Sequence, residues 1–252
     1  MAICYVYTMA DHIIIAHRGD ARHFPENSWL AFHSALEHGA SYIECDVQLS
    51  ADLHPVLFHD RDLERLCQQT GAVHDYEYAE LMTLSLSYEK RFGERFRENR
   101  LTDLVHLVSM LQQYPGATLF VELKRISLEY FGVECVLSHV LPLLSSLQDR
   151  CVIISYNFSA LQEARRKGWK AVGFVTDQWS TLNEKRIREL APKWCFCDYE
   201  GLPDESLFYL PGTHIAVFEV PTIELARSLW KRGIDAVETF NIRELTEALR
   251  HG

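Results

Sequence analysis

Eight short apolar runs, rich in β-branched residues, recur along this chain, and longer amphipathic stretches separate them. The runs read HIIIAH, YIECDV, TLFVELK, CVIISY, KAVGFVT, WCFCDY, HIAVFEV and IDAVE. This alternation is typical of a parallel sheet wrapped by helices, and eight strands is the number that closes a barrel. The 252 residues, 48% of them hydrophobic, are a common size for one such unit. We therefore predict an α/β fold, a (β/α)8 TIM barrel.

One segment interrupts the alternation of strand and helix. Residues 61–100 are long, polar and rich in Arg and Glu, and they follow the second predicted strand. Elsewhere a helix follows its strand closely, as in NSWLAFHSALEHG, where Asn27 or Ser28 would cap the start and Gly39 the end. Long loops at the carboxyl ends of barrel strands build the pocket. We predict a single domain over residues 1–252, with a small lobe at about 61–100 inserted after the second strand.

Composition limits the partners and the compartment. The formal net charge of −10 argues against a nucleic-acid partner, which requires a concentrated basic face. No run approaches the roughly twenty apolar residues that span a bilayer, so we expect no membrane span. The start of the chain lacks a secretory signal, and the seven cysteines lie mostly in apolar runs, so we expect reduced thiols and a cytoplasmic protein. Met9 could be the natural start, which would make residues 1–8 an extension. Composition leaves the oligomeric state open.

Ionisable side chains gather at the carboxyl ends of the first three predicted strands. They are His17 and Arg18 on the first, Glu44 and Asp46 on the second, His59 and Asp60 just after it, and Glu122 and Lys124 on the third. Residues two apart on a strand share a face, whereas Cys45 points to the other face. An unpaired carboxylate in a barrel interior costs several kcal/mol, so we expect these groups to cluster at the rim where barrel active sites are built.

The three carboxylates indicate a metal site. Glu44, Asp46 and Glu122 would repel one another without a cation among them, and oxygen ligands suit a hard ion such as Mg²⁺ or Ca²⁺. Arg18 and Lys124 would neutralise the oxygens of a phosphate at the same place. Each pair taken alone has a simpler interpretation, since Glu-x-Asp is a weak signal and Glu-x-Lys is often an internal ion pair. Their occurrence on consecutive strands favours the metal site.

Two histidines complete the predicted chemistry. Cleavage of a phosphodiester removes one proton from the attacking oxygen and delivers one to the leaving oxygen, and imidazole titrates near neutral pH, where it can do either. His17 and His59 are our candidates, with Asp60 as an orienting partner. A histidine near a strand end is most often structural, which is how we interpret His12, His106 and His214.

The ordered motifs resemble one enzyme family. Residues 16–60, AHRGDARHFPENSWLAFHSALEHGASYIECDVQLSADLHPVLFHD, resemble the opening of the glycerophosphodiester phosphodiesterase family, and VELK and SYNFSAL continue the match in order. The resemblance implies an eight-stranded barrel with a small inserted lobe. It places the family's metal-binding carboxylates on Glu44, Asp46 and Glu122, its catalytic histidines on His17 and His59, and its phosphate-binding cations on Arg18 and Lys124.

The resemblance also implies a reaction, the metal-dependent hydrolysis of a small glycerophosphodiester to sn-glycerol 3-phosphate and an alcohol. The neighbouring glycerol hydroxyl would attack first, and water would then open the cyclic phosphate. We expect His17 to act as the base and His59 as the acid, although the reverse assignment is open. Two alternatives are another phosphodiesterase on the same barrel, acting on intact lipid, and a non-catalytic phosphate-binding barrel.

Three positions depart from the family pattern. Leu53 stands where glycine is usual, so the turn must form without glycine's freedom at positive φ, and we expect a change in its shape. FEVP replaces an aromatic-Thr-Val-Asn stretch, and Phe240 replaces an aspartate. We expect Phe218 to form an aromatic wall for the substrate, and Glu219 to meet a cationic head group.

Overall fold

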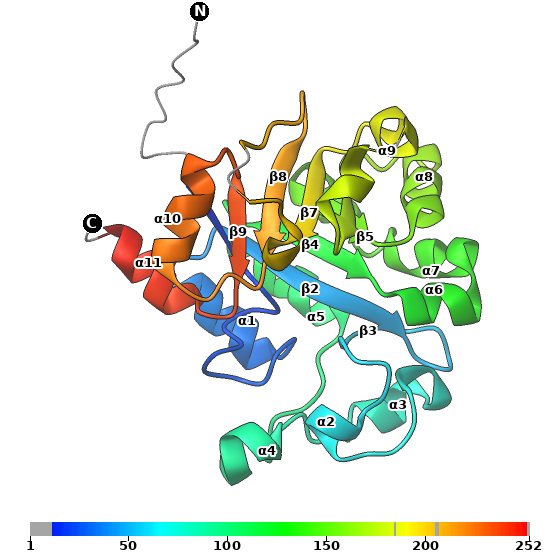
Figure 1. The fold of residues 1–252 in the computed structure, drawn as a ribbon. Coiled ribbons are helices and arrows are strands. Elements are labelled where there is room, and N and C mark those ends of the chain that lie inside the picture. The colour runs from blue at the N-terminus through cyan, green and yellow to red at the C-terminus, as the bar shows by residue number, and fades with distance from the viewer. Residues whose placement is uncertain (1–11, 184, 205–206, 251–252) are drawn as a thin grey trace, which may run out of the picture.

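The computed structural model describes residues 12–183, 185–204 and 207–250, and residues 1–8, interpreted above as an extension, lie outside that part (Figure 1). Eight parallel strands follow one another around a barrel. They are β1 (Ile13–Ala16), β2 (Tyr42–Leu49), β4 (Thr118–Leu123), β5 (Cys151–Ser155), β6 (Val172–Thr176), β7 (Trp194–Asp198), β8 (His214–Phe218) and β9 (Ala236–Thr239). Because β1 pairs with both β9 and β2, the ring is closed, which confirms the predicted TIM barrel.

Helices surround the strands on the outside (Figure 1). They are α1 (Trp29–Glu37), α5 (Leu104–Leu111), α6 (Arg125–Phe131), α7 (Val133–Val140), α8 (Phe158–Arg166), α9 (Lys185–Leu190), α10 (Ile223–Lys231) and α11 (Ile242–Arg250). The larger apolar cluster lies between strands and helices, whereas a smaller one, including Ile15, Phe120 and Phe196, fills the barrel. Ser28 caps α1 by accepting a hydrogen bond from the Ala31 amide. None of the helices in the described ranges is long and apolar enough to cross a membrane.

A short ninth strand, β3 (Pro55–Leu57), was not predicted. It runs antiparallel to the end of β2, with Val47 opposite Leu57. The turn before it contains Leu53 at φ 67, so the leucine adopts the left-handed conformation that glycine usually supplies. Ser50 stabilises this turn, because its backbone N–H donates to the His54 carbonyl and its hydroxyl donates to Asp52. The turn therefore does contain a residue at positive φ, contrary to the expectation that it forms without one, and these hydrogen bonds hold the leucine in place.

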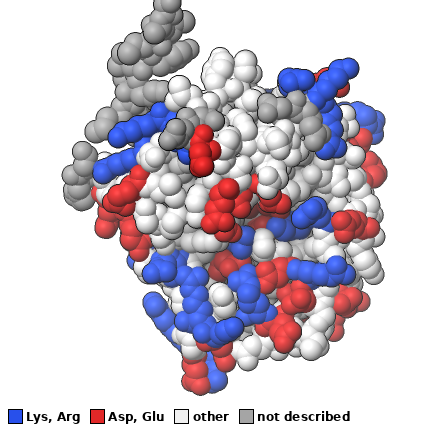
Figure 2. Space-filling model, in the orientation of Figure 1, with Lys and Arg blue, Asp and Glu red and all other residues white. Residues whose placement is uncertain are grey.

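Between β3 and α5 the chain forms a small lobe with its own apolar core. The lobe contains α2 (Glu64–Cys67), α3 (Tyr78–Leu81), α4 (Glu89–Phe92) and the 3₁₀ segments Val73–Asp75 and Gly93–Phe96. Leu63, Leu66 and Leu81 are fully buried within it and pack with Phe58, at the edge of the barrel. Figure 1 shows α2, α3 and α4 grouped together below the barrel. Figure 2 shows Lys and Arg gathered over this region with acidic side chains among them.

Candidate active site

The three predicted metal ligands converge at one place. Glu44 and Asp46 lie on β2, and the register of the neighbouring strand puts Glu122 of β4 directly beside Asp46. One carboxylate oxygen from each lies within 4.8 Å of the others. Cys45 faces the opposite way, into the core between strands and helices. Strand alternation therefore presents two carboxylates on one face, and strand pairing supplies the third.

The donor set fits a hard divalent cation. Glu44 is 1% exposed, and within the described part of the chain its Oε1 has no hydrogen-bond partner. Burial raises the pKa of Glu44 well above its ordinary value, and the neighbouring charges of Asp46 and Glu238 raise it further. A cation among these oxygens would remove the repulsion and give the orphaned oxygen a partner. The residues present can therefore hold Mg²⁺ or Ca²⁺, both of which prefer oxygen ligands.

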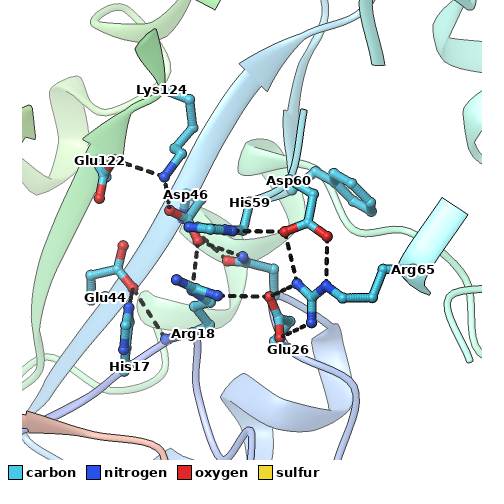
Figure 3. Close-up of polar contacts among 12 residues, drawn as sticks. His17, Arg18, Glu26, Glu44, Asp46, His59, Asp60, Arg65, Glu122 and Lys124 are labelled. Carbon is cyan, nitrogen blue, oxygen red and sulfur yellow. Dashed lines mark hydrogen bonds and ion pairs between the residues drawn. The ribbon is translucent and has the colours of Figure 1, made fainter. Parts of the chain in front are cut away.

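Two cations lie on either side of Asp46 (Figure 3). Arg18 Nε is 3.1 Å from Oδ2 of Asp46, and Lys124 Nζ is 3.1 Å from Oδ1. Lys124 Nζ also donates to Glu122 Oε1 at 2.9 Å. Although burial raises the pKa of Asp46, the Lys124 and Arg18 charges hold it well below its ordinary value. Asp46 is therefore ionised, and the two predicted phosphate-binding cations lie beside the predicted metal ligands.

His17 is held flat against an aromatic ring. Its imidazole stacks on Phe240, with ring centroids 4.5 Å apart and planes 9° apart, and its Nε2 is 3.9 Å from Glu44 Oε2. Burial lowers the pKa of His17 well below its ordinary value, and the Arg18 charge lowers it further. Phe240 was noted in the sequence only as a departure. In the structure it fixes the plane of a predicted catalytic ring.

A hydrogen bond at Nδ1 orients the ring of His59. Its Nδ1 donates to Asp60 Oδ1 at 2.8 Å, with Asp60 as the ionised acceptor. Burial by itself raises the pKa of Asp60, but hydrogen bonds from His59 and Arg65 hold it well below its ordinary value. Gln48 Nε2 on β2 donates to the Phe58 and Asp60 carbonyls and so supports the loop that carries His59. Nε2 of His59 is therefore the nitrogen left to exchange a proton with a substrate.

His17 and His59 line the same cavity, of about 100 Å³, together with Glu44, Glu122 and Lys124. Phe218 and Glu219, the two residues predicted to contact the alcohol, also line it. A wider hollow of about 390 Å³ adjoins this cavity, because Arg18, His59 and Glu219 line both. The lobe contributes Arg65, Tyr88 and Arg91 to the wider hollow. The lobe therefore shapes the approach to the site as well as covering the barrel edge.

Sequence reasoning missed four polar residues of this site, namely Glu26, Asn27, Arg65 and Glu238. Asn27, at φ 56, donates from its amide to Asp46 Oδ2 at 2.8 Å and accepts from the Asp46 amide at 3.2 Å. Glu238, on β9, is 3% exposed, and one of its oxygens lies within 4.8 Å of ligand atoms of His17 and Glu44. Glu44 was identified because it is an acidic residue within an apolar strand. Glu238 has the same position within IDAVE and could have been identified in the same way. No comparable signal marks Arg65 in its polar segment.

Comparisons with known proteins agree with this architecture. A sequence profile of the glycerophosphoryl diester phosphodiesterase family matches residues 17–197. A glycerophosphodiester phosphodiesterase of Caldanaerobacter subterraneus subsp. tengcongensis is 32% identical over 154 residues, which is 61% of this chain and 62% of that protein. Another from Bacillus altitudinis is 32% identical over 148 residues, 59% of each chain. The matched stretch thus spans about three fifths of these relatives.

A solved structure extends the similarity to nearly the whole chain. It is that of a phosphodiesterase from Oleispira antarctica in complex with the product sn-glycerol-3-phosphate. Its TM-score to this protein is 0.82 at 25% identity, and the superposition covers 95% of this chain and 97% of that one. The family profile, the closed barrel and the ordered motifs of the first three strands lead to one conclusion: the chain belongs to the glycerophosphoryl diester phosphodiesterase family.

Proposed function

We propose that this protein hydrolyses small glycerophosphodiesters to sn-glycerol 3-phosphate and an alcohol, with Mg²⁺ or Ca²⁺ bound by Glu44, Asp46 and Glu122. The observation that carries the proposal is that two histidines line one cavity together with Glu44 and Glu122, whose ligand oxygens lie within 4.8 Å of one of Asp46, in a barrel of this family. The product bound by the Oleispira antarctica phosphodiesterase supports the choice of substrate class.

The chain supplies the binding contacts from residues that lie just after β1 and β4. Arg18 and Lys124 stand on either side of Asp46 and would pair with the non-bridging phosphate oxygens. The divalent ion, when bound, supplies positive charge that polarises the phosphoryl oxygen and offsets the charge developing in the transition state. Burial of Glu44 and Asp46 keeps water away from these contacts and strengthens them.

We assign His17 as the base of the first step and His59 as the acid. The lowered pKa of His17 keeps its imidazole neutral at neutral pH, so it can accept the proton of the glycerol hydroxyl. The oxygen–phosphorus bond to that hydroxyl forms as the bond to the leaving alcohol breaks, and His59 delivers a proton to the departing oxygen. Asp60 accepts from Nδ1 of His59 and so leaves Nε2 as the nitrogen that delivers this proton. Opening of the cyclic phosphate by water returns both protons, with the roles exchanged.

Glu219 and Phe218 would contact the leaving alcohol. The Glu219 side chain is exposed, lines both hollows, and lies at φ 63. We propose that its charge favours a cationic head group such as choline. A β-branched replacement would be strained at this φ, so Glu219→Gln is the variant that changes the charge alone. A charge contact worth about 1 kcal/mol predicts a roughly fivefold fall in the rate on the choline diester relative to the glycerol diester. An unchanged ratio would exclude a role for the Glu219 charge in selecting the head group.

The deciding experiment incubates purified protein with glycerophosphocholine, with and without EDTA, and measures release of sn-glycerol 3-phosphate. We expect release that EDTA abolishes and Mg²⁺ or Ca²⁺ restores, together with loss of activity in His17→Ala. Absence of release with any divalent ion would favour a non-catalytic phosphate-binding barrel. Release from an intact phospholipid but not from the water-soluble diester would favour a lipid-acting phosphodiesterase.

A further inference from the structure

Arg65, in α2 of the inserted lobe, binds two carboxylates at once (Figure 3). On one edge of its guanidinium, Nε donates to Asp60 Oδ2 at 2.5 Å and Nη2 donates to Asp60 Oδ1 at 2.9 Å. On the next edge, Nη1 donates to Glu26 Oε2 at 3.0 Å and Nη2 donates to Glu26 Oε1 at 2.7 Å. The ring of Tyr88 lies 5.1 Å from its central carbon. One side chain of the lobe thus forms a bidentate pair of hydrogen bonds with each carboxylate.

Each of these carboxylates also holds a group of the proposed site. Asp60 accepts from Nδ1 of His59 at 2.8 Å. Glu26 accepts from Nη1 of Arg18 at 2.8 Å, and Arg18 in turn lies against Asp46. A continuous chain of hydrogen bonds and ion pairs therefore runs from the proposed acid to a proposed metal ligand, and Arg65 is its central member.

The alternative is that Arg65 only fastens the lobe to the barrel. The dependence of two carboxylates on Arg65 argues for more than that. Glu26 is 5% exposed, and although burial raises its pKa, hydrogen bonds from Arg65 and ion pairing with Arg18 hold it below its ordinary value. Asp60 depends on Arg65 in the same way. Without the guanidinium, Asp60 would keep His59 and Glu26 would keep Arg18 as side-chain donor, each carboxylate could turn, and the directions of His59 and Arg18 would change with them.

We propose that Arg65 is a positioning residue, through which the inserted lobe sets the orientation of His59 by way of Asp60 and that of Arg18 by way of Glu26. The inference rests on the proposed function for the meaning of those two orientations. It adds to that function a role in catalysis for the inserted lobe. A lysine could supply the charge but not two bidentate pairs, because an ammonium has no planar fork.

The test compares Arg65→Met and Arg65→Lys with the control Arg97→Met. Arg97 lies in the same lobe and also binds two carboxylates, Glu89 at 3.2 Å and Glu94 at 2.8 Å, but these pairs are exposed and do not line the site. Two quantities are measured for each variant at a temperature well below its Tm, where it is folded. They are kcat on glycerophosphocholine and the ¹⁵N imidazole spectrum of His59. The spectrum reports which ring nitrogen carries the proton, and it needs no substrate.

We expect kcat to fall on the order of 30-fold in Arg65→Met, within the hundredfold that a misplacement of about 1 Å can cause. Arg65→Lys should recover only part of this loss, and Arg97→Met should stay within about twofold of the wild type. In both Arg65 variants the His59 Nδ1–H signal should weaken or shift. A His59 spectrum identical to that of the wild type in Arg65→Lys overturns the proposal, as does unchanged kcat. An inactive wild-type protein would defeat the proposed function, while the spectrum would still decide the positioning role.

Discussion

Replacement of Glu238 by glutamine is expected to stabilise the metal-free protein above neutral pH and to leave it almost unchanged in acid. Glu238 is buried, and within the described part of the chain its Oε1 has no hydrogen-bond partner. Burial raises its pKa well above the ordinary value, and the charges of Glu122 and Asp46 raise it further. Glu44, whose ligand oxygen lies within 4.8 Å, is raised in the same way. Glutamine keeps the shape of the side chain and removes the charge.

The size of the effect follows from the separation of the two carboxylates. At 4.8 Å and an effective dielectric constant of about 20, two ionised carboxylates repel by about 3.5 kcal/mol. Keeping one of them protonated at about pH 8, starting from an unfolded pKa of about 4.3, costs about 5 kcal/mol. The folded protein takes the cheaper of these two options, which is to keep both carboxylates ionised and bear their repulsion. Glutamine removes this repulsion, so it should add about 3 kcal/mol to the free energy of unfolding at this pH. For a chain of this size that corresponds to an increase in Tm of roughly 6–12 °C.

The difference in stability between Glu238→Gln and the wild type depends on pH. A carboxyl whose pKa is raised in the folded state stabilises the fold below the unfolded pKa, and this contribution is lost as pH rises through the folded pKa. The variant should therefore match the wild type at about pH 4 and exceed it at about pH 8. Calorimetric unfolding in EDTA at the two pH values measures this difference, and added Mg²⁺ should shrink it by neutralising Glu44. An equal Tm difference at both pH values would refute the argument.

Three further substitutions test separate contacts. Asp60→Asn should lower kcat by about 10- to 100-fold with little change in KM, because the ionised partner of His59 Nδ1 is lost, and steady-state kinetics would show it. Phe240→Ala should move the acidic limb of the kcat/KM pH profile to higher pH, because water admitted beside His17 lets its depressed pKa rise toward about 6.5; an unmoved limb would mean that His17 is not the titrating base. Gly19→Ala should lower the free energy of unfolding by about 3 kcal/mol or more in urea unfolding, because Gly19 is at φ +81 and the new Cβ would lie 2.6 Å from the Ala31 carbonyl carbon.

The sequence determined the barrel and most of the ionisable residues that meet in its cavity. Both are local properties of strands, since apolar β-branched runs mark the strands and residues two apart share a face. Glu44, Asp46 and Glu122 are therefore predictable as neighbours once their strands are predicted to be adjacent and parallel. The order of the strands along the chain was enough to bring His17 and Arg18 to the same end.

Only the tertiary structure decided which groups hold these residues in place. Glu26 and Arg65 are 39 positions apart and meet because the lobe folds back beside the barrel. Closure of the barrel, which pairs β9 with β1, brings Phe240 and Glu238 to His17. Side chains that act through such long-range contacts have no periodic pattern along the sequence, because their partners lie on segments whose separation is fixed only by folding. For the same reason the conformation of Leu53 depended on hydrogen bonds around its turn as well as on its own preference.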